Sequence, residues 1–370
     1  PEGDIYIYSD PDYVVEGRPG GLAAFDPDHN CAMLLGMKYF GEHKKGTLTL
    51  AWSIANRYGY VACHGGMKSY RLEGKAPFTV GVFGLSGSGK STLTHEKHEG
   101  RYDIQVLHDD AYVISTEDGS SVAMEPTYFD KMQDYPVEHP ANKFLLTLQN
   151  VGVTLDENGQ KVVLAEDVRN SNGRAIKSQF WTDNRVNHFD TPVNAIIWLM
   201  KDETLPPVLK ITNPVLAATM GATLATRRST AEKLDANVDA NALVIEPYAN
   251  PFRTYPLARD YESYKMLFQD CNVDCYILNT GFYGAKKIPK EVTLGLLESI
   301  VTGDIKFQQF GSYENLQYAE VPGFEPPFEE REYHRALHNA FEFRYNFVEA
   351  QKGKKNELPE EVLDVLKALM

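Results

Sequence analysis

The sequence predicts a mixed α/β fold, a P-loop domain in which mixed sheets are flanked by helices. Three observations indicate this class. A β-branched and aromatic run, Phe78–Phe83, leads into a glycine-rich turn and then into a polar helix that begins at Lys90. A second apolar run, Asn194–Met200, is typical of a buried strand. Further along, helical and strand patterns alternate up to the C-terminal helices, as they do in α/β proteins.

The remaining elements follow in order. Before the glycine-rich turn we expect loops and short strands over 1–30, a strand over 31–35, a buried helix over 47–55, a strand over 59–64 and a polar connection over 65–76. After it we expect a strand over 103–107, a β-rich region over 111–195 with a hairpin turn at 156–159, helices over 214–225, 260–270 and 289–301, a strand over 274–279, a turn-rich segment over 302–326, and helices over 328–351 and 359–369. Residues 226–241 read as a mobile loop. We predict two domains, 1–65 and 66–370, with the first carrying candidate metal ligands.

Composition narrows the possible partners. Of 370 residues, 43% are hydrophobic and 24% are charged, and the net charge is −14. These values are typical of a soluble globular protein, and the acidic balance argues against binding nucleic acid. No apolar run approaches the length of a membrane span. The four cysteines lack close zinc spacing and read as reduced thiols. We therefore expect a cytoplasmic monomer or small homo-oligomer that acts on a small molecule.

The glycine-rich turn fits the phosphate-binding P-loop pattern G-x-x-x-x-G-K-[ST]. Its glycines let backbone N–H groups turn inward around an anion, and the helix that follows adds its positive N-terminal end. A lysine at this position reaches the terminal phosphates, and the next hydroxyl is a natural Mg²⁺ ligand. The expected nucleoside triphosphate contacts are Gly84, Leu85, Ser86, Gly87, Ser88, Gly89, Lys90, Ser91 and Thr92.

Two acids follow the next predicted strand. Residues 103–107 are apolar enough for a strand, which ends at His108-Asp109-Asp110. Carboxylates at a strand end downstream of a P-loop are the expected form of a second cation site. Asp109 and Asp110 are therefore candidate metal ligands.

Several motifs together resemble the ATP-dependent phosphoenolpyruvate carboxykinase family. GLSGSGKST resembles the kinase motif of that family, including Leu85-Ser86 between the first two glycines. YFGEHKKG, starting at Tyr39, resembles its Y-x-G-E-x-K-K-G motif. The resemblance implies a carboxykinase-like fold. It also implies that Lys45, His64 and Asp110 ligate a metal ion and that Tyr39 belongs to the substrate site.

The resemblance extends from about residue 20 to near the C-terminus. YFDK, ending at Lys131, resembles a segment whose lysine lies near the substrate, and NGR, ending at Arg174, resembles the segment whose arginine bridges substrate and γ-phosphate. NTG at 279–281, with Lys287 and Thr293, is similar to the nucleotide-base site. Two departures stand out. Gly65-Gly66-Met67 follows His64 where the family has Cys-Ser-Ala-Asn, and the large N-terminal lobe of the family, with its carboxylate-binding arginine, has no counterpart.

The resemblance implies conversion of oxaloacetate and ATP to phosphoenolpyruvate, CO₂ and ADP with Mn²⁺ and Mg²⁺. Decarboxylation leaves an enolate, whose developing charge needs a fixed cation. The implied set of Lys45, His64 and Asp110 would hold Mn²⁺ for this purpose, with the lysine binding as a neutral amine, and Ser91 would hold Mg²⁺. Lys90, Lys131 and Arg174 would surround the transferred phosphoryl group, and the loop at 226–241 would close over the enolate.

Two other functions remain open at this point. A P-loop kinase acting on another small molecule or protein would use the P-loop and Asp110 without requiring Lys45 and His64 as metal ligands. A nucleotide-binding relative without catalytic activity would bind ATP but turn over no oxaloacetate. The missing lobe implies either a fragment of a longer protein or a divergent relative with another substrate. Together with the glycines after His64, it also favours the relative without catalytic activity.

Overall fold

The computed structural model of the protein describes residues 3–38, 40–85, 87–125, 127–131, 136–139, 142–146, 152–164, 174–178, 183–227 and 243–370. The chain forms two compact units. One comprises Pro1–Met124 and His188–Met370, and the other comprises Glu125–Asn187. Most of the predicted mobile loop at 226–241 lies outside the described residues.

An 11-stranded mixed sheet dominates the larger unit. Its strand order is β13-β8-β7-β4-β5-β14-β18-β15-β22-β21, and β6 also pairs with β4. The three central strands β5, β14 and β18 are parallel, whereas β4 and β15 flank them in antiparallel orientation. The strands are β4 (Tyr60–Arg71), β5 (Phe78–Phe83), β6 (Asp103–His108), β7 (Ala111–Ser115), β8 (Ser121–Ala123), β13 (His188–Phe189), β14 (Ala195–Met200), β15 (Val208–Ile211), β18 (Asp274–Asn279), β21 (Gln308–Phe310) and β22 (Tyr313–Tyr318).

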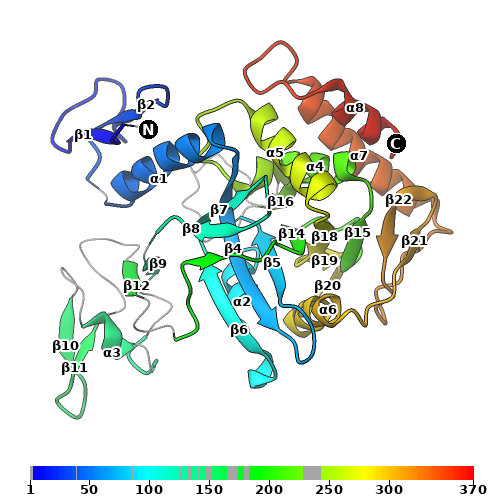
Figure 1. Ribbon diagram of the computed structural model, residues 1–370, viewed down its shortest axis with the longest axis horizontal. Helices are drawn as coiled ribbons and strands as arrows, with labels where there is room; N and C mark the ends of the chain where they lie inside the picture. Colours follow the sequence, from blue (N-terminus) through cyan, green and yellow to red (C-terminus); the bar gives the residue numbers. More distant parts are fainter. Residues whose placement is uncertain are drawn as a thin grey trace. The chain divides into compact units, whose positions relative to one another are not determined.

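Helices cover this sheet on both sides. In Figure 1, α4, α5, α7 and α8 gather along one side, and α2 and α6 lie along the other. The side chains of β14 point alternately toward the two sides of the sheet. Trp198 donates a hydrogen bond to the Ala217 carbonyl of α4 and packs on Tyr264 of α5. The helices are α2 (Lys90–His95), α4 (Pro214–Ala222), α5 (Leu257–Asp270), α6 (Lys290–Thr302), α7 (Arg331–Glu349) and α8 (Glu360–Lys367), with 3₁₀ turns at His98–Gly100 and Pro247–Ala249.

Smaller elements complete the larger unit. A three-stranded sheet of β1 (Tyr6–Asp10), β3 (Cys31–Leu35) and β2 (Leu22–Asp26) precedes α1 (Phe40–Arg57). Two-stranded ladders join β16 (Ala225–Arg227) to β17 (Leu243–Ile245) and β19 (Phe282–Tyr283) to β20 (Lys286–Lys287). All four cysteines are free thiols. In the described part of the chain, no helix combines the length and the hydrophobicity needed to cross a membrane.

The smaller unit contains two antiparallel ladders and one short helix. β9 (Thr127–Lys131) pairs with β12 (Arg174–Ser178), β10 (Val153–Leu155) pairs with β11 (Lys161–Val163), and α3 spans Asn142–Leu145. The hairpin predicted at 156–159 is confirmed. The backbone amide of Asp156 donates a hydrogen bond to the Gln160 carbonyl, and Gly159 adopts a φ of 73°. The Asn142 side chain ties α3 to β11 by exchanging two hydrogen bonds with the backbone of Val163.

The structure corrects three local predictions. β4 continues through the segment expected to be a polar connection and ends only at Arg71. β4 also continues across the predicted domain boundary after residue 65. The two-domain division stays a prediction, and the compact units divide the chain at other positions. α1 begins at Phe40, seven residues earlier than predicted, and the turn-rich segment at 302–326 contains the edge strands β21 and β22. In each case polar residues or glycines hid an element that is stabilised by tertiary packing.

Gly66 shows how tertiary packing decides β4. A side chain at Gly66 would overlap Thr94 of α2, so the glycine lets the helix lie directly on the strand. We expect Gly66→Ala to lower the free energy of unfolding by about 2 kcal/mol through overpacking. Urea denaturation measures this, and combining it with Thr94→Ala should recover part of the loss. Purely additive effects of the two substitutions would contradict the proposed contact.

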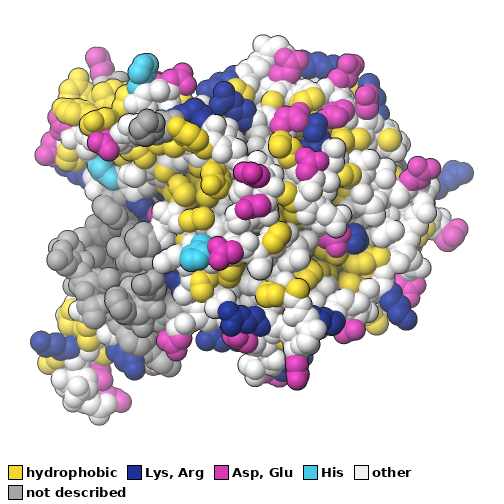
Figure 2. Space-filling model, in the orientation of Figure 1, with side chains coloured by type: hydrophobic (Ala, Val, Ile, Leu, Met, Phe, Trp, Pro, Cys, Tyr) yellow, Lys and Arg dark blue, Asp and Glu magenta, His cyan; other side chains and the backbone are white. Residues whose placement is uncertain are grey.

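One side of α1 remains partly exposed. Figure 2 shows acidic and basic side chains interspersed over the face in view and hydrophobic side chains gathered over α1. There, a groove of about 420 Å³ is lined by residues that include Ala51, Ile54 and Tyr58. On the other side of the helix, Leu48 and Trp52 are buried in the core. This buried side attaches α1 to the core of the larger unit.

Candidate active site

The P-loop connects β5 to α2. Gly87 and Gly89 have φ angles of 76° and 95°, in the left-handed region that favours glycine. Gly84 is close-packed, because a side chain there would lie 2.9 Å from Leu199 Cβ. The hydroxyl of buried Ser88 has no hydrogen-bond partner among the described residues. These features are those of a loop shaped to hold an anion.

Three predicted metal-ligating side chains meet at one point. Lys45 Nζ lies 2.6 Å from Asp110 Oδ2, and His64 Nε2 lies 3.1 Å from Asp110 Oδ1. They come from α1, β4 and the turn after β6, which are separated by up to 65 residues along the chain. Antiparallel pairing of β4 with β6 and β7 places His64 opposite Ala111, next to Asp110.

The His64 ring is held on all sides. Its Nδ1 lies 2.6 Å from the Ala249 carbonyl oxygen, and its faces and edges meet Trp52 and Phe252 at centroid distances of 6.3 and 5.4 Å. Tyr248 and Ala249 both adopt positive φ angles, 54° and 52°, which are uncommon for residues other than glycine. This strained turn presents the carbonyl to the histidine.

The protonation states at this point leave two electron-pair donors. Burial, and next the positive charge of Lys90, lower the pKa of His64 to about 4, so the ring is neutral near pH 7. We assign the ring proton to Nδ1, because a carbonyl only accepts hydrogen bonds. Nε2 therefore directs a lone pair toward a carboxylate oxygen. Burial raises the pKa of Asp110, but the positive charges of Lys45 and Lys90 outweigh it and bring the pKa well below its usual value. Two electron-pair donors that face one another fit a bound metal ion.

Lys44 was missed by the sequence reasoning. Its Nζ lies 3.0 Å from Asp110 Oδ2, and its side chain is 13% exposed, less than the 21% of Lys45. The signal was present, since both lysines belong to the same K-K-G motif. Whether a second lysine also reaches the acid depends on how α1 is rotated against β4, and a motif does not specify that rotation.

Asp109 has a different partner. Its Oδ2 lies 3.1 Å from Nε2 of His95, which ends α2. Burial raises the pKa of Asp109, but the hydrogen bond and charge of His95 bring it below its usual value. Of the two adjacent acids, Asp110 thus contacts Lys45 and His64, whereas Asp109 contacts the helix that follows the P-loop. A metal-ligating role for Asp109 stays a prediction.

Other predicted site residues are described only in part. Tyr39 and Ser86 lie outside the described residues. Lys131 and Arg174 are described by their backbone, and the ladder of β9 with β12 pairs them directly opposite one another. Residues 43 positions apart in sequence are thereby brought together within the smaller unit, and their catalytic roles stay predictions.

The predicted base site lies at the end of β18. Thr293 is buried in the first turn of α6, whereas Lys287 is exposed on β20. The side chain of buried Asn279 donates to the carbonyl oxygens of Asp202, Leu205 and Phe282 at 2.7–2.9 Å. The ends of β14 and β18 are therefore tied to each other.

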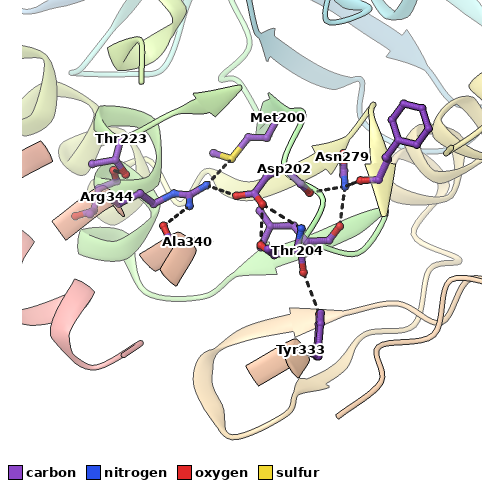
Figure 3. Close-up of polar contacts among 11 residues, drawn as sticks. Met200, Asp202, Thr204, Thr223, Asn279, Tyr333, Ala340 and Arg344 are labelled. Atoms are coloured by element: carbon purple, nitrogen blue, oxygen red, sulfur yellow. Dashed lines mark hydrogen bonds and ion pairs between the residues drawn. The ribbon is translucent and has the colours of Figure 1, made fainter. Parts of the chain in front are cut away.

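A buried ion pair anchors the same corner. Figure 3 shows Arg344 extending from α7 to Asp202, with an Nη2–Oδ2 distance of 2.9 Å. The other oxygen of Asp202 accepts hydrogen bonds from the Thr204 backbone and hydroxyl, and the Tyr333 hydroxyl donates to the Thr204 carbonyl. The side chains of Arg344 and Asp202 are 0% and 3% exposed. Sequence reasoning missed this pair, whose members lie 142 residues apart.

The fold and the glycine-rich loop define a protein of the P-loop class, with a candidate cation site next to that loop. A family model described as phosphoenolpyruvate carboxykinase matches residues 11–325, and the chain belongs to this family.

The chain is similar to several curated members. It is 29% identical over 317 residues to the phosphoenolpyruvate carboxykinase (ATP) of Aeropyrum pernix, covering 82% of this chain and 61% of the relative. It is 23% identical over 351 residues to the glycosomal phosphoenolpyruvate carboxykinase (ATP) of Trypanosoma brucei brucei, covering 86% and 71%. The chain of Bradyrhizobium sp. with the same name is 24% identical over 324 residues, covering 82% and 56%. The chain thus spans about three fifths of the Aeropyrum relative's length.

Proposed function

We propose that the protein is an ATP-dependent phosphoenolpyruvate carboxykinase that converts oxaloacetate and ATP to phosphoenolpyruvate, CO₂ and ADP. The observation that carries this proposal is the convergence of Lys45 and His64 on Asp110. A kinase acting on another acceptor requires the P-loop but no such set. The positive charge of Lys90 lowers the pKa of both His64 and Asp110, so the set lies within electrostatic reach of the P-loop lysine.

The donor set suits a divalent transition metal. A neutral imidazole nitrogen, a carboxylate and a lysine nitrogen are appropriate ligands for Mn²⁺, and the exposed Ser91 hydroxyl at the first turn of α2 suits Mg²⁺. When bound, these ions would supply positive charge for the enolate oxygen and for the phosphates. Residues of the chain position this set. The Ala249 carbonyl orients His64, and the centre of the Phe252 ring lies 4.9 Å from Lys45 Nζ at the border of the site.

The predicted nucleotide and substrate residues would carry out the phosphoryl transfer. Backbone N–H groups of the P-loop and Lys90 would hold the phosphates, and Thr293 with Lys287 would contact the base. Lys131 and Arg174, which face each other across a ladder, would flank the transferred group, and Tyr39 would contact the substrate. In this scheme the residues position reactants and stabilise charge without forming a covalent intermediate.

We further propose a cytoplasmic enzyme that acts on a small molecule as a monomer or small homo-oligomer. Four free cysteines are consistent with a reducing compartment. The net charge of −14 argues against a nucleic-acid partner.

A coupled assay tests the reaction directly. Phosphoenolpyruvate formation from oxaloacetate and ATP would be followed with Mn²⁺ and Mg²⁺ present, on this chain and on any longer native form. We expect activity that requires both ATP and the metal ions. Binding of ATP without phosphoenolpyruvate formation in either form would contradict the carboxykinase assignment and leave a P-loop kinase with another acceptor or a relative without catalytic activity.

Lys90→Met tests the phosphate site. The variant keeps the side-chain stem and removes the charge that would contact the terminal phosphates. We expect kcat/KM for ATP to fall by about a hundredfold or more. Lys97→Met is the matched control, because this exposed lysine follows the other end of the same helix. Equal losses in both variants would contradict a specific role for Lys90.

A further inference from the structure

β14 ends between two parts of the candidate nucleotide site. It pairs in parallel with β5 on one side and with β18 on the other. The carboxyl ends of the three strands therefore share one edge, where the P-loop follows β5, Lys201 follows β14, and Thr280 and Gly281 follow β18. Neighbouring strands lie about 4.8 Å apart, so a path from the P-loop to the end of β18 crosses the end of β14 midway.

The side chain of Lys201 leaves the strand on the P-loop side. Leu199 faces Gly84 of the P-loop, whereas Met200 faces away, with its sulfur 3.6 Å from Arg344 of α7. Because side chains alternate along a strand, Lys201 follows Leu199. A side chain on Gly281 would lie 3.1 Å from Lys201 Cβ and 3.3 Å from its Cγ. The stem of the lysine therefore lies against the glycine backbone at the predicted base site.

The backbone around Lys201 is held in place on both sides. The Thr280 amide donates to the Met200 carbonyl at 3.0 Å, and the Asp202 carboxylate is fixed by Arg344. The Asn279 side chain binds the Asp202 carbonyl. Because this backbone is fixed and the lysine is half-buried, its ammonium group can move only within a small region. A binding residue requires such a restriction.

We propose that Lys201 binds the nucleotide where its α-phosphate joins the ribose. This inference rests on the proposed ATP binding and adds a contact that neither the P-loop nor the base site supplies. A triphosphate held at the P-loop, with its base near Thr293, must pass the end of β14. An ammonium group carries three hydrogen-bond donors and a full positive charge, which suit a phosphate or ribose oxygen.

Calorimetric titration tests the proposal without requiring turnover. MgATP, MgADP and pyrophosphate would be titrated into the parent chain and into Lys201→Met, Lys201→Arg and the exposed control Lys352→Met. We expect Lys201→Met to weaken ATP and ADP binding by about tenfold or more while pyrophosphate, which reaches only the P-loop, binds as in the parent. Lys201→Arg keeps the charge and should recover much of the affinity, and the control should match the parent.

The outcomes separate this inference from the proposed function. Parental ATP affinity in Lys201→Met would overturn the role of Lys201 and leave ATP binding intact. Equal losses for pyrophosphate and ATP would also overturn it, because they would indicate general damage to the P-loop. No binding of any nucleotide by the parent chain would overturn the proposed ATP function and this inference with it. Nucleotide binding without phosphoenolpyruvate formation would contradict only the carboxykinase assignment.

Discussion

Asp110→Asn is expected to lower phosphoenolpyruvate formation by on the order of a thousandfold. The Asp110 carboxylate lies 2.6–3.1 Å from side-chain nitrogens of Lys44, Lys45 and His64, so the amide would keep the shape of the side chain but remove a negative charge that all three groups contact. Mn²⁺ affinity should fall together with turnover. The coupled assay measures turnover, and electron paramagnetic resonance of free Mn²⁺ measures the affinity.

Asp103→Asn is the matched control. Asp103 begins the strand that precedes Asp110, and its side chain is 64% exposed and pairs with Arg71 at the surface. Surface ion pairs contribute about 0–1 kcal/mol, so activity and Mn²⁺ affinity should stay at the parental level. If Asp110→Asn retained both properties, the proposed metal site at this point would be wrong.

Arg344→Met is expected to lower the free energy of unfolding by about 3–5 kcal/mol. The substitution would leave the carboxylate of Asp202, which is 3% exposed, without its cationic partner in the protein interior. A buried charge without a partner is costly because the carboxylate loses its hydration and gains no compensating interaction. Urea denaturation monitored by circular dichroism measures the loss.

Two further variants make this result specific. Arg335→Met changes the same residue type on the same helix at a side chain that is 73% exposed, and its effect should be small. Adding Asp202→Asn to Arg344→Met removes the unpaired negative charge of the Asp202 carboxylate and should recover part of the stability. Destabilisation that is the same with and without Asp202→Asn would show that lost packing, rather than the ion pair, is responsible.

Local patterns were sufficient for much of the central architecture. The P-loop could be recognised because its requirements are local: an apolar strand, glycines at positive φ and a lysine at the start of a helix. β14, β18 and the helices α5, α6 and α7 follow from runs and periodicities within a dozen or so residues. The resemblance of short motifs also indicated the family, and Lys45, His64 and Asp110 were predicted as one set before any fold was known.

Tertiary structure decided what depends on distant partners. The close packing of α2 on β4 depends on the space left by Gly66, and the contact of Lys44 with Asp110 depends on how α1 packs. Asp202 and Arg344 carry no local signal because their pairing spans 142 positions. The place of Lys201 follows only from the strand order β5-β14-β18. By itself the sequence indicated which residues are candidates for the chemistry, since motifs record local geometry. Only the fold decided which of them meet, because burial and pairing join segments that are far apart in the chain.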